Sequence, residues 1–321
     1  MLLGGGVLLY FGAEWLVAGS AGLARAMGVT PLLIGLTVVA YGTSAPEVVV
    51  GVGASLDGHG AIALGNVLGS NVANIALILG VTALIKPAAV DGSLRLREVP
   101  MLVISALALP LLILDGEVSR IEGIALLVWA FVYTGWMVRS ARAPERAHAK
   151  EAAAATEQAA DQAGALPQTK SKARLAFTAA LGLVGLVVGG KLLVDGATGI
   201  ATVLGVSERI IGLTIVAVGT SLPELATSII AALNDESDIA VGNVVGSNIF
   251  NVLLCLGGAA ATRPVPAVLS DVAIDVSAMV ALTLLAAFLL RTQRKITRVE
   301  GGILLGAYVL FLNLLVLEGA I

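Results

Sequence analysis

The sequence predicts an all-α polytopic membrane protein with ten transmembrane helices arranged as two inverted five-helix repeats. Three observations support this fold class: apolar runs of about 20 residues recur along the chain, charge is scarce, and the sequence repeats itself once. Of the 321 residues, 58% are hydrophobic and 13% are charged, whereas soluble domains carry about 25% charged residues. This composition excludes a solvated globular enzyme, a disordered chain and a nucleic-acid-binding protein.

Ten apolar runs, separated by charged or polar breaks, mark the predicted spans. Each is long enough to approach or cross a hydrocarbon core of about 30 Å. The first begins at Leu2 without a basic leader or a small-residue cleavage site, so we expect it to be retained as a span. The runs cover about residues 2–23, 31–56, 61–85, 98–114, 121–138, 174–201, 208–233, 238–261, 268–290 and 298–318.

A polar, Ala-rich and charged segment at residues 139–173 divides the chain into a first repeat, 1–138, and a second repeat, 174–321. Lysine and arginine residues concentrate in the cytoplasmic loops of membrane proteins. The loops on the side of the 139–173 linker hold 15 of these residues, and the loops on the opposite side hold 3. We therefore expect a protein of the plasma (inner) membrane with a cytoplasmic linker and both termini outside.

The two halves are related by a shift of 177 residues. This shift aligns 12–80 with 189–257 without a gap, and 33 of the 69 aligned pairs are identical. The best-matched segment is G-T-S-x-P-E, which ends at Glu47 and again at Glu224. Because each half holds an odd number of predicted spans, the halves enter the membrane from opposite sides, which is the arrangement that transporters use for alternating access. A duplication kept only for packing is the alternative, and the matching of polar residues inside apolar helices disfavours it.

Glu47 and Glu224 lie near the middle of their predicted spans, without a Lys or Arg close by in sequence. A charged side chain at the centre of a membrane helix costs about 2.5–3.5 kcal/mol on insertion scales. Two carboxylates at equivalent positions therefore indicate a shared cationic ligand. A pair of protonated, hydrogen-bonded carboxylic acids is the structural alternative.

Small and hydroxyl-bearing residues accompany each glutamate at positions i, i+3, i+4 and i+7, which form one stripe of a helix. Pro46 and Pro223 each lack an N–H, which frees a backbone carbonyl one turn earlier. Carbonyl, hydroxyl and carboxylate oxygens together make a site suited to hard cations such as Ca²⁺ and Na⁺. The two stripes are Ala40, Thr43, Ser44 and Glu47, and Ala217, Thr220, Ser221 and Glu224.

The third and eighth predicted spans carry further polar side chains at i, i+4 and i+8. Their amide and hydroxyl oxygens can complete a coordination shell, or they can form interhelical hydrogen bonds. The pattern favours ligands at Ser70, Asn74, Ser247 and Asn251. Hydrogen bonding between helices is at least as good an interpretation for Asn66, Asn71, Asn243 and Asn248.

The paired G-T-S-x-P-E and G-N-V-x-G-S-N-x-x-N segments resemble the signature repeats of the calcium/cation antiporter superfamily, and most closely those of prokaryotic sodium/calcium exchangers. The resemblance implies that Glu47 and Glu224 are shared by Ca²⁺ and Na⁺, and that the carbonyls of Thr43 and Thr220 join them on Ca²⁺. It implies two flanking Na⁺ sites and a central region, built respectively from Ala40, Ser44 and Ser247, from Ala217, Ser221 and Ser70, and from Asn74 and Asn251. Asn251 resembles the potassium-independent pattern, because the potassium-dependent branch carries Asp there.

We therefore expect an antiporter that exports Ca²⁺ in exchange for Na⁺, with Ca²⁺/H⁺ exchange at the same glutamates as the alternative. Its expected partners are the two ions and the lipid bilayer, without a cofactor or an obligate protein partner. An intramembrane protease would need a nucleophile beside a buried His or a pair of catalytic aspartates, and the predicted spans contain neither constellation. A channel is disfavoured by the inverted repeat. Lys191 and Asp195 are predicted to pair at i, i+4 within one helix.

Overall fold

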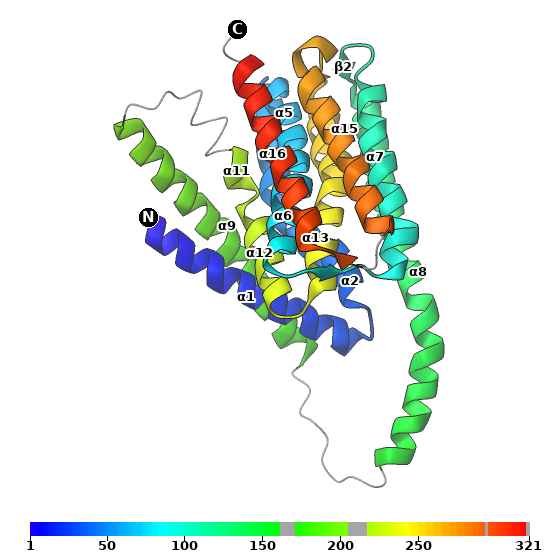
Figure 1. The fold of residues 1–321 in the computed structure, drawn as a ribbon. Helices are drawn as coiled ribbons and strands as arrows, with labels where there is room; N and C mark the ends of the chain where they lie inside the picture. Colours follow the sequence, from blue (N-terminus) through cyan, green and yellow to red (C-terminus); the bar gives the residue numbers. More distant parts are fainter. Residues whose placement is uncertain (161–170, 205–216, 293–294, 319–321) are drawn as a thin grey trace.

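The computed structural model describes residues 1–160, 171–204, 217–292 and 295–318, and most of them are helical (Figure 1). In the first half of the chain, short π-helical segments interrupt the α-helices at three places among the described residues. The elements are α1 (Leu2–Met27), α2 (Pro31–Ile34), η1 (Gly35–Val39), α3 (Ala40–Thr43), α4 (Ala45–Leu56), α5 (Gly60–Val72), η2 (Ala73–Ile78), α6 (Leu79–Ile85), β1 (Ala88–Ala89), η3 (Leu94–Glu98), α7 (Val99–Leu112), β2 (Glu117–Val118) and α8 (Arg120–Ala160).

The second half follows a similar order. Its elements are α9 (Lys172–Val203), α11 (Ala217–Thr220), α12 (Leu222–Leu233), α13 (Ser237–Phe250), η5 (Asn251–Leu256), α14 (Gly257–Thr262), β3 (Val265–Pro266), α15 (Leu269–Thr292), β4 (Lys295–Ile296) and α16 (Arg298–Glu318).

Among the described residues, seven helices are long and apolar enough to cross a membrane, and an eighth span results if the bent pair Pro31–Thr43 and Ala45–Leu56 is counted as one. The fourth predicted span, 98–114, corresponds to η3 and α7, which form one continuous helix over Leu94–Leu112; this helix is not among the seven, and its first turns carry Arg95, Arg97 and Glu98. Part of the seventh, 208–233, lies outside the described residues. The protein is thus an integral membrane protein, while the count of ten spans in two repeats stays a prediction.

Helices α1 and α9 lie side by side and run antiparallel, tilted against the bundle of α5, α7, α13 and α15 (Figure 1). A Cβ added at Gly12 would lie 2.7 Å from the backbone nitrogen of Leu186, and one added at Gly182 would lie 2.3 Å from that of Leu16. The backbones therefore touch, as small residues allow in membrane helix pairs. We call the residues in this contact the glycine seam: Gly5, Gly12, Gly19, Gly182 and Gly189.

Two short antiparallel strand pairs join the halves of the chain: β1 pairs with β4, and β2 pairs with β3. The helix that follows β2 and the helix that follows β4 begin with the same capping box. The Ser119 backbone N–H donates to Glu122 Oε2 at 2.8 Å and the Glu122 N–H donates back to Ser119 Oγ at 3.3 Å. The Thr297 N–H donates to Glu300 Oε2 at 2.7 Å and the Glu300 N–H donates back to Thr297 Oγ1 at 3.3 Å. The resemblance between the halves therefore extends beyond the aligned 12–80 segment.

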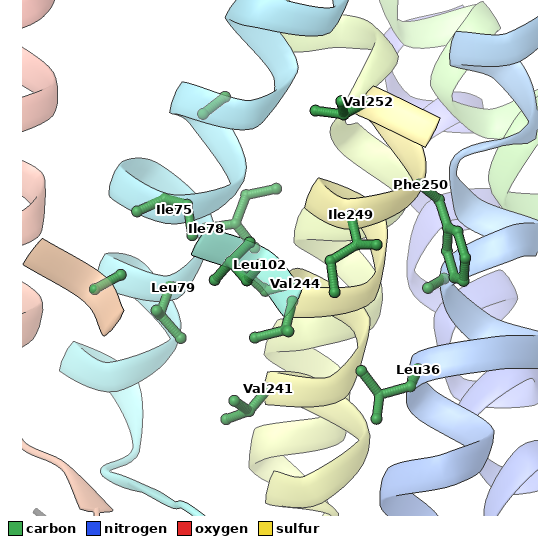
Figure 2. Close-up of a cluster of buried hydrophobic side chains, with 14 of the residues drawn as sticks. Leu36, Ile75, Ile78, Leu79, Leu102, Val241, Val244, Ile249, Phe250 and Val252 are labelled. Carbon is green, nitrogen blue, oxygen red and sulfur yellow. The ribbon is translucent and has the colours of Figure 1, made fainter. Parts of the chain in front are cut away.

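Among the candidate spans of the described residues, the run formed by α13, η5 and α14, Ser237–Thr262, is the most enclosed, with 94% of its most apolar stretch buried. A helix that is apolar all round belongs inside a protein. Figure 2 shows Val241 and Val244 of this helix between Leu79 on one side and Leu36 on the other. This central helix and its counterpart, Gly60–Ile85, carry the second set of candidate ligands.

Two ion pairs fix the loop between α12 and α13. Lys86 Nζ lies 2.6 Å from Asp235 Oδ1, and Arg25 Nη1 lies 3.2 Å from Glu236 Oε1. Asp235 has φ of 63°, and the equivalent residue in the first half is Gly58, with φ of 86°. The equivalent loops of both halves therefore contain a residue in the left-handed backbone conformation. In the second half this residue, Asp235, also forms an ion pair with Lys86.

Candidate cation-binding site

Each G-T-S-x-P-E segment forms a helix break at its serine. Ser44, with φ of −82° and ψ of 2°, separates α3 from α4, and Ser221, with φ of −89° and ψ of 8°, separates α11 from α12. Pro46 and Pro223 occupy the first turn of the helix after each break, where a missing N–H is tolerated. The axis bends by 42° at the first break. The prediction that proline interrupts both helices is confirmed.

The two glutamates lie in the first turn after each break, and both are fully buried at 1% exposure for Glu47 and 0% for Glu224. Their carboxylates are close enough to interact electrostatically. The Ser44 hydroxyl donates a hydrogen bond to Glu224 Oε1 at 3.1 Å. This bond links the break of the first half directly to the carboxylate of the second.

Several buried oxygen atoms around the glutamates accept or donate no hydrogen bond among the described residues. Burying such groups without a partner costs free energy, and more so for a carboxylate at membrane depth. A cation coordinated by these oxygens would offset that cost, since Ca²⁺ and Na⁺ prefer oxygen ligands. The atoms are both carboxylate oxygens of Glu47, Oε2 of Glu224, Oγ of Ser221 and of Ser247, and Oδ1 of Asn74.

The described residues contain no group of three or more His, Cys, Asp and Glu side chains that could hold a metal ion. Beyond the two carboxylates, a cation here would therefore depend on neutral oxygen atoms. Broken helices supply such oxygens from freed carbonyls, and polar side chains supply the rest.

The remaining candidate ligands sit on the two enclosed helices that pack against the breaks. Ser70 lies on α5 and Ser247 on α13, both buried. Asn74 lies in η2 and Asn251 begins η5, and single π-helical turns inside α-helices are frequent at functional sites. Helix α13 packs against α3, and η2 packs against α12, so each half contributes helices to the surroundings of the other half's glutamate.

Some predicted ligands are already engaged by protein groups. The Thr43 hydroxyl donates to Asn243 Oδ1 at 3.0 Å. The Asn251 amide donates to Asn71 Oδ1 at 3.3 Å. A Cβ added at Gly246 would lie 2.7 Å from the Cβ of Ala40, so these two residues pack closely against each other. Ala217 begins α11 and Thr220 ends it.

Two residues interpreted from sequence as packing asparagines contact the backbone of the site. Asn66 Nδ2 donates to the Glu47 carbonyl at 3.2 Å, and Asn243 Nδ2 donates to the Glu224 carbonyl at 3.4 Å. Their positions four residues before Ser70 and Ser247 placed them on the same stripe as the ligands. That spacing is the signal that could have found them.

Comparisons with known proteins place the chain in one family. The sodium/calcium exchanger protein family model matches residues 1–139 and 174–317. The putative antiporter CaxA of Alkalimonas amylolytica is 41% identical over 314 residues, covering 96% of this chain and 95% of that protein. The sodium/calcium exchanger MaX1 of Methanosarcina acetivorans is 31% identical, covering 98% of this chain and 97% of that protein.

A solved structure of the sodium-calcium exchanger NCX_Mj, soaked with Na⁺ and Ca²⁺, superimposes with a TM-score of 0.82 at 33% identity, covering 97% of this chain and 96% of that one. The family match, the two long sequence matches and the shared fold therefore all point to the same family. The site itself has two buried carboxylates at equivalent helix breaks. This chain is a membrane antiporter that belongs to the sodium/calcium exchanger family.

Proposed function

We propose that this protein exports Ca²⁺ in exchange for Na⁺ by alternating access, with Glu47 and Glu224 as the shared ligands. The observation that carries the proposal is the pair of buried carboxylates, one from each half, at equivalent helix breaks and within electrostatic range. One divalent cation would neutralise both charges. The names of the related exchangers support Ca²⁺ and Na⁺ as the ions.

The proposed Ca²⁺ site combines the two carboxylates with the backbone carbonyls of Thr43 and Thr220. The engagement of the Thr43 hydroxyl by Asn243 supports coordination through its carbonyl. Asn74 and Asn251 would complete the central region. The proposed flanking Na⁺ sites are Ala40, Ser44 and Ser247, and Ala217, Ser221 and Ser70.

The hydroxyl groups of Ser221 and Ser247 favour Na⁺ over H⁺ as the coupling ion. Both are buried without a hydrogen-bond partner among the described residues. A proton binds to one carboxylate oxygen and needs no other ligand atoms. A Na⁺ ion, in contrast, needs several neutral oxygen atoms around it. By charge, Ca²⁺ would cancel the −2 of the two glutamates, whereas three Na⁺ would leave a net charge of +1.

We expect ⁴⁵Ca²⁺ uptake into proteoliposomes loaded with Na⁺, in potassium-free buffer, and little uptake under a pH gradient alone. With three Na⁺ per Ca²⁺ one net charge moves per cycle, so a potential of 100 mV biases exchange by about 2.3 kcal/mol. Clamping the potential with the sign that favours Na⁺ exit should accelerate uptake, and reversing it should slow uptake.

Empty liposomes and the chain without an ion gradient are the controls. Uptake driven equally by the pH gradient would overturn sodium coupling. If the rate of sodium-driven uptake does not change with the clamped potential, two Na⁺ are exchanged per Ca²⁺. That result would contradict electrogenic export.

We propose that both termini face outward and that the 139–173 linker is cytoplasmic, in the plasma membrane. The antiparallel α1 and α9 support an inverted relation between the halves, because these helices hold equivalent places in the two repeats. In a Cys255→Ser background, Ala155→Cys should react only with reagents that reach the cytoplasm, and Glu117→Cys only with reagents outside. Labelling of both from one side would refute this orientation.

A further inference from the structure

The Asn243 side chain makes three hydrogen bonds beside the candidate site. It is fully buried, accepts a hydrogen bond from the Thr43 hydroxyl at 3.0 Å, and donates to Ser228 Oγ at 3.1 Å and to the Glu224 carbonyl at 3.4 Å. A side-chain amide has two N–H donors, so Asn243 uses both of them. Its NH₂ group is therefore committed to the protein.

The equivalent residue of the first half, Asn66, makes the equivalent bond to the Glu47 carbonyl at 3.2 Å. The two halves differ around it, because Ser228 has Gly51 as its counterpart. Asn66 cannot make a side-chain hydrogen bond of the Ser228 type at that position. The bonds of Asn243 also cross between halves, since Thr43 belongs to the first half and Glu224 to the second.

We infer that Asn243 is a positioning residue that fixes the two broken helices relative to each other. Its oxygen accepts a hydrogen bond from the Thr43 hydroxyl, and its amide donates to the backbone of Glu224. The inference rests on the proposed function and adds a residue that acts through Thr43 and Glu224 without touching the ion. Loss of the amide would leave buried donors and acceptors unpaired and let the two half-sites move apart.

The test is a double-mutant cycle between Thr43→Val and Asn243→Ala, read as equilibrium ⁴⁵Ca²⁺ affinity of purified protein in detergent. Thr43→Val keeps the backbone carbonyl and the side-chain shape but removes the hydroxyl. We expect each single variant to weaken Ca²⁺ binding by about tenfold or more, the scale of one buried hydrogen bond. The double variant should bind Ca²⁺ about as weakly as Asn243→Ala alone, because both remove the same bond.

Two variants sharpen this test. Thr43→Ser, which retains a hydroxyl, should bind Ca²⁺ more tightly than Thr43→Val. Asn248→Ala removes another buried amide from α13, whose Nδ2 donates to the Val244 carbonyl of its own helix at 2.7 Å, and should leave Ca²⁺ affinity close to that of the wild type. The melting temperature without Ca²⁺ is measured for every variant.

Additive effects of Thr43→Val and Asn243→Ala would overturn the inference while leaving the proposed exchange intact. So would lowered melting temperatures with unchanged Ca²⁺ affinity, which would make Asn243 a packing residue only. If Asn243→Ala does not fold, the Ca²⁺ affinities of Thr43→Ser and Thr43→Val test the inference instead. Equal affinities of these two variants would overturn it. A wild-type protein that binds no ⁴⁵Ca²⁺ would overturn both the proposed function and the inference.

Discussion

Glu47→Gln and Glu224→Gln should each abolish sodium-driven Ca²⁺ uptake while the protein still folds. Either change lowers the charge of the candidate site from −2 to −1 and leaves a divalent cation undercompensated in a low-dielectric interior. Both residues are fully buried, so bulk water cannot replace the lost charge. Uptake of ⁴⁵Ca²⁺ into proteoliposomes measures the effect, and size-exclusion chromatography checks the fold.

Glu98→Gln provides a matched control. Glu98 is also a buried carboxyl, but its partner is the Tyr133 hydroxyl, which donates to it. A glutamine there keeps an acceptor for that bond, so we expect transport to persist. Wild-type uptake by either site variant would remove that glutamate from the mechanism, and equal loss in Glu98→Gln would make the effect a general one of buried carboxyls.

Gly182→Ala should disrupt the α1–α9 pair and strongly reduce the amount of folded, active protein. The added methyl would lie 2.3 Å from the Leu16 nitrogen and 2.6 Å from the Gly12 oxygen. Both are backbone atoms, which cannot turn aside as a side chain can. Overpacking of this kind costs about 1–3 kcal/mol or more, so we expect a lower melting temperature and lower ⁴⁵Ca²⁺ uptake.

Gly6→Ala is the control on the same helix pair, because an added Cβ at Gly6 meets nothing within 4 Å. It should leave both the melting temperature and uptake near those of the wild type. If Gly182→Ala were as stable as Gly6→Ala, the close approach of the two backbones would be wrong.

The parts of the fold that sequence could predict are those encoded by local chemistry. Pro46 and Pro223 predicted the breaks, and the i, i+4 spacing predicted the Lys191–Asp195 pair, whose charged atoms lie 3.9 Å apart. Hydropathy could not show that the fourth helix begins before the charged residues Arg95, Arg97 and Glu98, because such residues read as a loop in sequence. The gapless alignment also missed the second capping box, since Thr297 follows Ser119 by 178 residues, one more than the shift of the aligned segment.

The candidate site was predictable as a set of residues but not as a network. The Ser44–Glu224 bond joins residues 180 positions apart, and no local pattern encodes such a contact. Arg25 and Glu236 are separated by 211 positions and were not expected to pair. For Asn243, sequence offered a packing role, because whether a buried amide bonds to a neighbouring helix or to the backbone of a site depends on how the two halves pack.

The glycine seam also has a consequence for biosynthesis. Helix α1 leaves the ribosome well before its partner α9, which is complete only at Val203. Translation proceeds at about 5–20 residues per second. The α1 side of the glycine seam therefore stays uncovered for on the order of 10–35 s, until α9 has been synthesised. During that interval it lies against lipid or against the insertion machinery, and the bundle cannot close before more than half of the chain has been translated.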